Sequence, residues 1–361
     1  MPGWRILLHS ERRLTDKGRR GQSVAVTVTG IAAFLVCVFS LCVGVGSVAI
    51  TPAESLRIIW GKLTGRGDFP DMNPSLVSIL WDIRMPRVAM AFLSGGALSL
   101  SGAVMQTILQ NPLASSYTLG VSSGASLGAA IVIASGISLP VLGTFLLPVT
   151  AFGMGFLVIA AVLFISSGIS SSLQTHTVIL MGMSVSLFVN ALLTLLSSFA
   201  GNRLQQLILW QMGSFSGMRW YHVEILAPVC LSGLILLVLH ARELDILSFG
   251  DEHALSLGVS VKGGKLFALT LSTLLTGAVV CFTGTIGFVD LVAPHAVRRV
   301  FGTENQKVLP LSFLFGGAFL ALCDMLSRSL LAPREIPVGA VTALAGTPFF
   351  IWLYVQGGKN G

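Results

Sequence analysis

The sequence predicts an all-α polytopic membrane protein with about ten transmembrane helices, and two observations lead to that prediction. Of the 361 residues, 53% are hydrophobic and only 10% are charged, whereas soluble domains are about a quarter charged. Residues 88–202 contain no Asp, Glu, Lys or Arg. At ~20 apolar residues per crossing, this stretch alone could hold four helices with their turns.

The chain opens with a basic segment, residues 1–23, ahead of its first apolar run. A basic flank beside a membrane span favours the cytoplasmic side. The alternative is a signal peptide, but the apolar run 24–50 is far longer than the ~7–15 residues of a cleavable core. We therefore expect a retained helix that follows a cytoplasmic N-terminus. Six of the 22 basic residues lie in this segment: Arg5, Arg12, Arg13, Lys17, Arg19 and Arg20.

The remaining apolar runs and their Pro, Gly or charged breaks place the other crossings. An even count returns the C-terminal tail, 357–361, to the cytoplasm, and 24–356 then form a single transmembrane domain. This topology puts 13 basic residues inside and 9 outside, so the orientation depends mainly on the N-terminal cluster. The predicted spans are 24–50, 85–108, 117–136, 143–166, 176–200, 223–241, 263–282, 285–301, 308–331 and 338–356.

Two stretches between spans are long. Residues 51–84 are predicted outside and contain an amphipathic piece that could lie along the membrane interface. Residues 242–262 are predicted inside, as two short helical turns separated by Gly250. Their apolar residues would face the cytoplasm, and an exposed apolar face usually has a partner.

Several chemical motifs are absent or incomplete. No Gly-x-x-x-x-Gly-Lys-Ser/Thr occurs, because Leu266 follows Lys265 at the one superficial match, so the chain has no phosphate loop of its own for ATP hydrolysis. The six histidines and five cysteines show neither HExxH nor CxxC, which argues against a metal or haem site.

Gly120-Val-Ser-Ser-Gly124 fits the Gly-x-Ser-x-Gly pattern of a hydrolase elbow. That motif needs a strand before Ser122 and a His and an acid within reach. Here it opens an apolar helix, and Gly128 continues the four-residue spacing. Gly120, Gly124 and Gly128 are therefore predicted to form a small-residue face for helix packing. A membrane-embedded hydrolase is a distant alternative.

Two acidic residues inside spans are candidate functional charges. Asp324 precedes Arg328 by four residues, so the two can pair on one helix face. Asp290 has no obvious partner in its own span, and an unpaired charge at mid-bilayer costs ~2.5–3.5 kcal/mol on insertion scales. Two acids give thin support to a proton- or sodium-coupled carrier.

The order of several motifs resembles the FecCD family, the permeases of ABC importers for iron siderophores, haem and cobalamin. The matching segments run across residues 80–355, and together they are highly specific. They are Arg-Met-Pro-Arg (84–87), Ser-Gly-Ala-Val-Met-Gln (101–106), Asn-Pro-Leu-Ala (111–114), Leu-Gly-Val-Ser-Ser-Gly-Ala (119–125), Gly-Thr-Ile-Gly-Phe (284–288), Pro-His-Ala-Val-Arg (294–298), Leu-Pro (309–310), Asp-Met-Leu-Ser-Arg (324–328), Glu-Ile-Pro-Val-Gly (335–339) and Gly-Thr-Pro-Phe-Phe (346–350).

The resemblance implies a type II importer permease in the cell membrane that works with a second permease subunit, either a second copy or a paralogue. An extracytoplasmic binding protein would deliver the cargo. Two separate ATPase subunits would hold ATP and magnesium, and this chain would bind no cofactor or metal and catalyse no reaction itself. Many members of the family have glycine after the Gly-Phe-Val segment 287–289, where this chain has Asp290.

The resemblance also assigns roles to particular residues. Arg84, Arg87 and Arg328 occupy positions that meet acidic residues of the binding protein, and the spans 176–200 and 338–356 would line the path. The ATPase-coupling segment would comprise Leu247, Phe249, Gly250, Ala254, Leu255, Leu257 and Gly258.

Three hypotheses for function remain after these observations. The first is a conduit for a ferric siderophore, with haem or cobalamin as close rivals. The second is an ion-coupled secondary carrier, which would depend on an ion gradient and not on ATP. The third is the membrane-embedded hydrolase, which would depend on Ser122.

Overall fold

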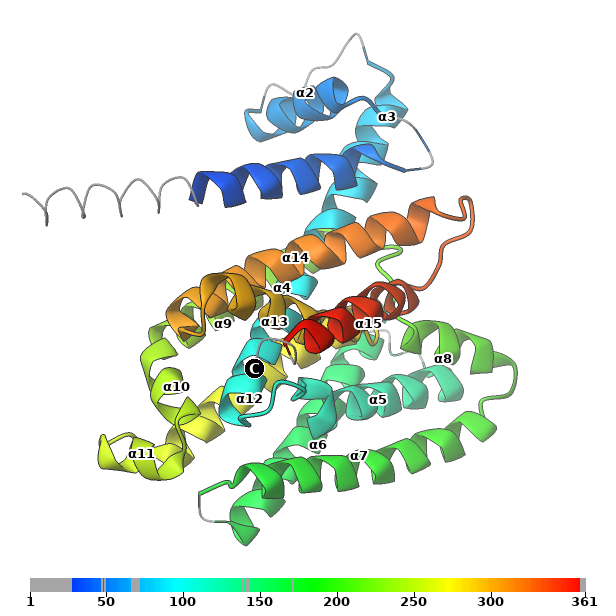
Figure 1. Ribbon diagram of the computed structural model, residues 1–361. Coiled ribbons are helices and arrows are strands. Elements are labelled where there is room, and N and C mark those ends of the chain that lie inside the picture. The colour runs from blue at the N-terminus through cyan, green and yellow to red at the C-terminus, as the bar shows by residue number, and fades with distance from the viewer. Residues whose placement is uncertain are drawn as a thin grey trace, which may run out of the picture.

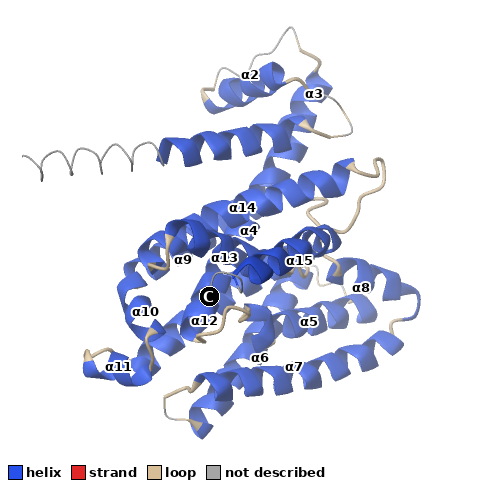
Figure 2. Cartoon of the chain, in the orientation of Figure 1, coloured by secondary structure: helices blue, strands red, loops and turns tan. Residues whose placement is uncertain are grey.

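A computed structural model of the chain describes residues 28–46, 48, 50–65, 72–137, 139, 143–170 and 172–357. The described residues form helices and connecting loops, and no strand occurs among them (Figures 1 and 2). The all-α prediction is confirmed. The predicted basic segment 1–23 and the tail beyond residue 357 lie outside the described residues.

The helices follow one another with short connections (Figure 1). An N-terminal helix, Val28–Gly44, comes first. The elements after it are α2 (Pro52–Leu63), α3 (Pro74–Ser78), the π-helix η1 (Ile79–Arg84), α4 (Met85–Ile108), η2 (Ser116–Leu119), α5 (Val121–Ser135), η3 (Gly143–Phe145), α6 (Leu146–Ile169), α7 (Thr175–Ser198), η4 (Gly201–Arg203), α8 (Leu204–Gln211), α9 (Trp220–Leu239), α10 (Ala241–Ser248), α11 (Asp251–Ser256), α12 (Val261–Thr283), α13 (Val289–Phe301), α14 (Asn305–Ser329) and α15 (Val338–Gly357).

Each of the ten predicted spans coincides with a helix, but the helices differ in length. Six are long and apolar enough to cross a membrane, and three more are shorter apolar helices. The predicted crossing 285–301 is wrong in extent. Its helix, α13, has 13 residues and rises only ~20 Å at 1.5 Å per residue, less than the ~30 Å of a bilayer core. Residues 284–288 before it are irregular because Gly284 and Phe288 both have a positive φ.

The predicted outer loop 51–84 is largely helical. α2 begins with a capping box in which Thr51 and Glu54 exchange hydrogen bonds, and those bonds hold the pKa of the Glu54 carboxyl below its usual value. The helix start predicted at residue 85 is also wrong, since one unbroken helix runs from Pro74 to Ile108. The π-helix η1 connects α3 to α4 within it, so Arg84 lies inside a continuous helix.

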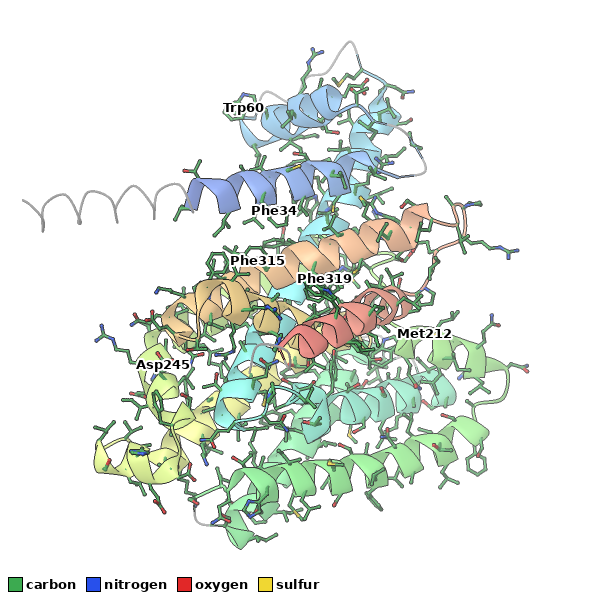
Figure 3. The ribbon with its side chains drawn as sticks, in the orientation of Figure 1. Phe34, Trp60, Met212, Asp245, Phe315 and Phe319 are labelled. Carbon is green, nitrogen blue, oxygen red and sulfur yellow. The ribbon has the colours of Figure 1, made fainter. Side chains whose placement is uncertain are left out.

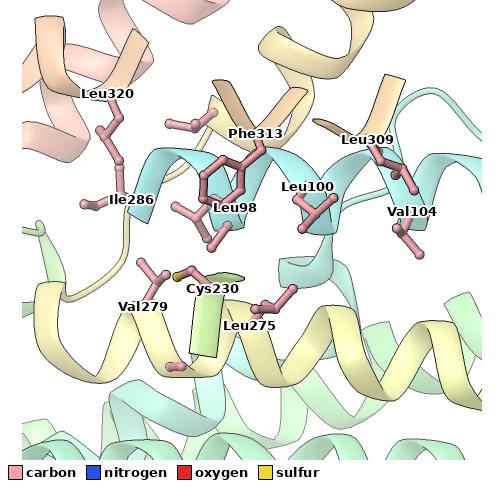
Figure 4. Close-up of a cluster of buried hydrophobic side chains, with 14 of the residues drawn as sticks. Leu98, Leu100, Val104, Cys230, Leu275, Val279, Ile286, Leu309, Phe313 and Leu320 are labelled. Carbon is pink, nitrogen blue, oxygen red and sulfur yellow. The ribbon is translucent and has the colours of Figure 1, made fainter. Parts of the chain in front are cut away.

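α4 is the central helix of the bundle, and α9, α12, α13 and α14 pack around it. Small residues allow the close approach, since a Cβ on Gly95 would strike the Gly316 carbonyl of α14 and a Cβ on Gly102 would strike the Asp290 carbonyl of α13. Apolar side chains fill the remaining space, with Phe313 of α14 above Leu98 and Leu100 of α4 in the core (Figure 4).

The N-terminal helix and α7 lie at the periphery. Phe34 stacks on Phe315 of α14 with ring centroids 5.8 Å apart, which fixes the N-terminal helix against the bundle (Figure 3). α7 is far less covered, and Leu187 and Phe188 are 70% and 65% exposed. In Figure 1 the helices run between two ends, one carrying α10 and α11 and the other carrying α8. We call these the α10 end and the α8 end.

Candidate docking and coupling sites

Arg87 forms a buried ion-pair cluster at the α8 end. Its Nη2 lies 2.9 Å from Asp324 Oδ1, and its Nη1 lies 2.7 Å from Glu335 Oε1. Nε also donates to both Asp324 oxygens at 3.0 and 3.1 Å. Such a fork-to-carboxylate arrangement suits a planar guanidinium. The cluster therefore joins the start of α4 to the end of α14 and to the segment before α15.

Arg328 completes this cluster from the same face of α14 as Asp324. Its Nε lies 3.6 Å from Asp324 Oδ2, so the i,i+4 pairing predicted from the sequence is present. The Asp324 carboxylate has its nearer contacts with Arg87, however. Arg328 Nη2 donates instead to the carbonyl of Cys42 at the end of the N-terminal helix.

Arg84 binds the same end of the N-terminal helix by capping its open carbonyls. Its guanidinium donates to the carbonyls of Val43 and Gly44 at 3.1 and 3.0 Å and to that of Val48. The last carbonyls of a helix lack intrahelical partners, and a cation satisfies them well. Arg84 thereby fastens the N-terminal helix to η1 and α4.

All three predicted docking arginines are thus buried and already have partners inside this protomer. Arg84, Arg87 and Arg328 are 4%, 7% and 9% exposed. Glu335, in contrast, reaches solvent with 39% of its side chain exposed. Sequence reasoning missed Glu335 as the second partner of Arg87, because 248 residues separate the two positions. Docking by the three arginines remains a prediction.

Asp290 lies in the first turn of α13, at the junction with η2, and not in the middle of a span. Its side chain is 2% exposed and accepts a hydrogen bond from the Ser115 hydroxyl. Its backbone carbonyl accepts from Gln106 Nε2 at 3.4 Å. A helix N-terminus also favours a carboxylate. The partner of Asp290 that the sequence could not supply is therefore Ser115, the N-cap residue of η2 in the same chain.

Gly120, Gly124 and Gly128 all lie close against α6. A Cβ on Gly124 would lie 2.8 Å from the Met154 carbonyl, and one on Gly128 would strike the Thr150 carbonyl, both on α6. Gly120 follows η2 with φ +89°, and a Cβ there would lie 2.8 Å from Val158, which is also on α6. Ser122 follows no strand, so the described residues provide no hydrolase elbow around it.

The coupling segment forms a helical corner at the α10 end, with α10 and α11 joined at Gly250. Gly250 has φ +108° and ψ +159°, a conformation that is essentially restricted to glycine. Leu247 and Ala254 pack inward. Phe249, Leu255 and Leu257 are 76%, 62% and 67% exposed, respectively. Gly258, with φ +79°, ends the segment.

Polar side chains anchor α10 to the bundle. Asp245 Oδ1 accepts from the backbone nitrogen of Asn305 at 2.9 Å and from its side-chain amide at 2.8 Å, which caps the start of α14. Gln110 Nε2, just beyond α4, donates to the carbonyls of Leu247 and Ser248. Asp245 lies on α10 beside this junction (Figure 3). Sequence reasoning missed both anchors.

A cleft of about 570 Å³ opens beside these anchors. Arg298 of α13 lines this cleft. Its guanidinium donates to Thr107 Oγ1 at 2.7 Å and to the Ala103 carbonyl at 3.0 Å. The cleft is therefore bounded by polar groups that already have partners. Among the described residues, no group of three or more His, Cys, Asp or Glu side chains could hold a metal ion.

The six helices that are long and apolar enough to cross a membrane indicate a multi-pass membrane protein. The profile of the FecCD transport family matches residues 33–356, and the chain belongs to that family. Its members are the membrane permeases of ABC importers, in which ATP hydrolysis is performed by a separate subunit.

Similar proteins cover nearly the whole chain. An uncharacterized ABC transporter permease, YvrB of Bacillus subtilis, is 40% identical over 342 residues, 95% of this chain and 96% of that protein. The hemin transport permease HmuU of Yersinia pestis is 36% identical over 84% of this chain and 88% of its own length. Other relatives are named as permeases for vitamin B12, iron(3+)-hydroxamate and Fe(3+)-citrate.

A solved structure gives the same picture of the fold. A metal-chelate type ABC transporter in an inward-facing conformation superposes with a TM-score of 0.80 at 29% identity, covering 91% of this chain and 99% of that one. The predicted type II importer permease fold is confirmed.

Proposed function

We propose that this chain is a transmembrane permease subunit of an ATP-driven importer for an iron chelate, with a ferric siderophore as the first candidate. The observation that carries the proposal is the exposed apolar corner of α10 and α11, where Phe249, Leu255 and Leu257 are each more than 60% exposed. Exposed apolar residues on a segment anchored from behind suit a protein partner. Two ATPase subunits are the proposed occupants, one on each permease.

This assignment places the α10 end and both chain termini in the cytoplasm. The α8 end then faces outward and receives the binding protein, and α7 and α15 line the path at the contact with a second permease. The chain itself binds no cofactor, and ATP and magnesium belong to the ATPase partners.

The names of the relatives support cargo of the metal-chelate class, since they include hemin, vitamin B12 and two iron(3+) chelates. Haem and cobalamin therefore stand beside a ferric siderophore as alternatives within the same importer type.

Uptake in a deletion strain tests the function. Radiolabelled iron on several siderophores, haem and labelled cobalamin are offered in parallel. Selective loss of one cargo, restored by the gene and blocked by vanadate, supports the proposal and identifies the cargo. Uptake that survives vanadate but stops when the ion gradient is collapsed would instead indicate a secondary carrier.

A triple substitution isolates the coupling corner. Phe249→Ser, Leu255→Ser and Leu257→Ser together should leave the permease folded, because none of the three side chains is buried. The ATPase should no longer copurify with it. Full copurification would place the ATPase contact elsewhere.

Binding-protein docking is proposed at the arginine cluster of the α8 end. A carboxylate of the partner would have to compete with Glu335 for Arg87, because Glu335 is the solvent-exposed carboxylate of that cluster. Glu335→Gln removes the competitor and should tighten docking, most clearly at low salt where screening is least. Arg334→Gln, one residue away and exposed, is the matched control. Weaker docking by Glu335→Gln would contradict an acidic partner at Arg87.

A further inference from the structure

Lys265 is a buried cation at the α10 end whose role none of the preceding sites explains. It lies one turn inside α12, and its side chain is only 4% exposed. An ammonium group taken out of water is costly unless its charge and its three donors are satisfied. The contacts of its Nζ therefore indicate what the residue holds in place.

Three oxygens from two separate segments surround the Lys265 ammonium. Nζ lies 2.7 Å from Asp251 Oδ1 and 2.9 Å from Oδ2, and it donates to the carbonyl of Leu173 at 3.3 Å. Asp251 is the first residue of α11, directly after the Gly250 corner. Leu173 stands two residues before α7. One side chain on α12 thus connects the coupling corner to the entry of α7.

Both ends of this connection are held firmly. The side chain of Leu173 is 1% exposed, and its φ of +53° lies in the left-handed region that non-glycine residues rarely occupy. Asp251 directly follows Gly250, whose backbone conformation turns the chain from α10 into α11. A displacement of α11 would therefore pull on the Leu173 carbonyl through Lys265.

The two halves of the coupling segment hold different parts of the bundle. α10 is anchored to α4 and α14 through Gln110 and through Asp245 with Asn305. α11 reaches α12 and the entry of α7 through Asp251 and Lys265. α7 is among the least covered long helices of the protomer, with 22% of its apolar window buried, and its packing is mainly against α5, α6 and η2.

We propose that Lys265 is the positioning residue that transmits movement of the coupling corner to α7, by holding Asp251 and the Leu173 carbonyl in one cluster. The proposal rests on the proposed function, because it needs an ATPase that moves α10 and α11. It assigns to Lys265 a mechanical role and no contact with cargo or nucleotide.

The test is a distance measurement in the assembled complex of permease, ATPase and binding protein. Spin labels replace Glu252 on α11 and His176 in the first turn of α7, both exposed, in a chain whose exposed Cys37 is serine. With the cluster intact we expect one narrow distance distribution that Mg-ATP with vanadate does not change. Lys265→Met should broaden it and make it depend on nucleotide. An unchanged narrow distribution in Lys265→Met would overturn the proposal.

Two further variants separate transmission from simple folding. Lys265→Arg keeps the charge and should restore the narrow distribution. Lys262→Met removes an exposed lysine of the same helix and should behave like the parent. Lys265→Met should be tolerated in folding because Asp251, with 29% of its side chain exposed, can be solvated by water. If Lys265→Met instead loses copurifying ATPase, its role is structural and the proposal fails.

Uptake of radiolabelled ferrichrome into proteoliposomes, counted per ATP hydrolysed, gives the functional readout. We expect Lys265→Met to keep most of the hydrolysis but to lose at least about fivefold in uptake per ATP. Equal ratios in Lys265→Met and the parent would refute transmission. No ferrichrome uptake by the parent would count against the siderophore assignment alone, because the distance measurement needs no cargo.

Discussion

Arg87→Met removes the cation at the centre of the cluster that joins α4, α14 and the segment before α15. Methionine keeps most of the length of the side chain and removes its charge. Asp324, which is 0% exposed, would lose the three contacts that it receives from Arg87. Only Arg328, at 3.6 Å, would remain beside it.

The magnitude follows from burial. Removing one partner of a buried ion pair typically costs about 3–5 kcal/mol, because the other charge is left uncompensated. Asp324 fits that case, whereas Glu335, with 39% of its side chain exposed, can be solvated and contributes at most about 1 kcal/mol. We therefore expect Arg87→Met to lower the free energy of unfolding by about 3–5 kcal/mol and Glu335→Gln by no more than about 1 kcal/mol.

The assay is reversible unfolding in mixed micelles, followed by the loss of helical circular dichroism as denaturing detergent is added. Arg334→Met is the matched control, since that arginine is exposed. If Arg87→Met is no less stable than Arg334→Met, the prediction is wrong.

Three other changes test separate features. At Gly128 there is no room for a Cβ against α6, so Gly128→Leu should lower the free energy of unfolding by at least about 1–3 kcal/mol through overpacking. Gly153→Leu on α6, a site with open space around it, should lower it little. Equal melting temperatures for the two variants would show that the close packing is unimportant. Asp290→Asn keeps an oxygen for the Ser115 hydroxyl and should leave assembly intact, and unchanged cargo uptake would rule out a functional carboxylate. Gly250→Val forces a β-branched residue into φ +108°, a strain of about 1–3 kcal/mol, and should uncouple ATP hydrolysis from uptake while the permease stays folded; full coupling would contradict the assigned corner.

Apolar runs located the helices of the bundle because a bilayer demands long apolar helices, and this requirement is visible in local composition. The structure differs where local composition carries no signal. The break of residues 285–301 into irregular backbone followed by α13 depends on the positive φ of Phe288. The extension of α4 back to Pro74 depends on the π-turn η1, which lets a polar, Pro-containing stretch continue as helix.

The candidate sites divide in the same way. The Asp324–Arg328 pair was predictable because i,i+4 residues share one helix face. The partnership of Arg87 with Glu335 and that of Lys265 with Asp251 were not, because helix packing and the Gly250 corner bring these residues together. The burial of Arg84 depends on the end of the N-terminal helix, whose position the sequence alone does not reveal.

The sequence separation between Arg87 and Asp324 sets a minimum delay, during synthesis of the chain, before this ion pair can form. The two residues are 237 positions apart, and at ~5–20 residues per second the ribosome needs about 12–50 s to make the intervening chain. During that interval Arg87 has no contact with Asp324, because α14 has not yet been made. A chain that ends before α14 therefore lacks the Asp324 carboxylate that Arg87 contacts in the complete fold.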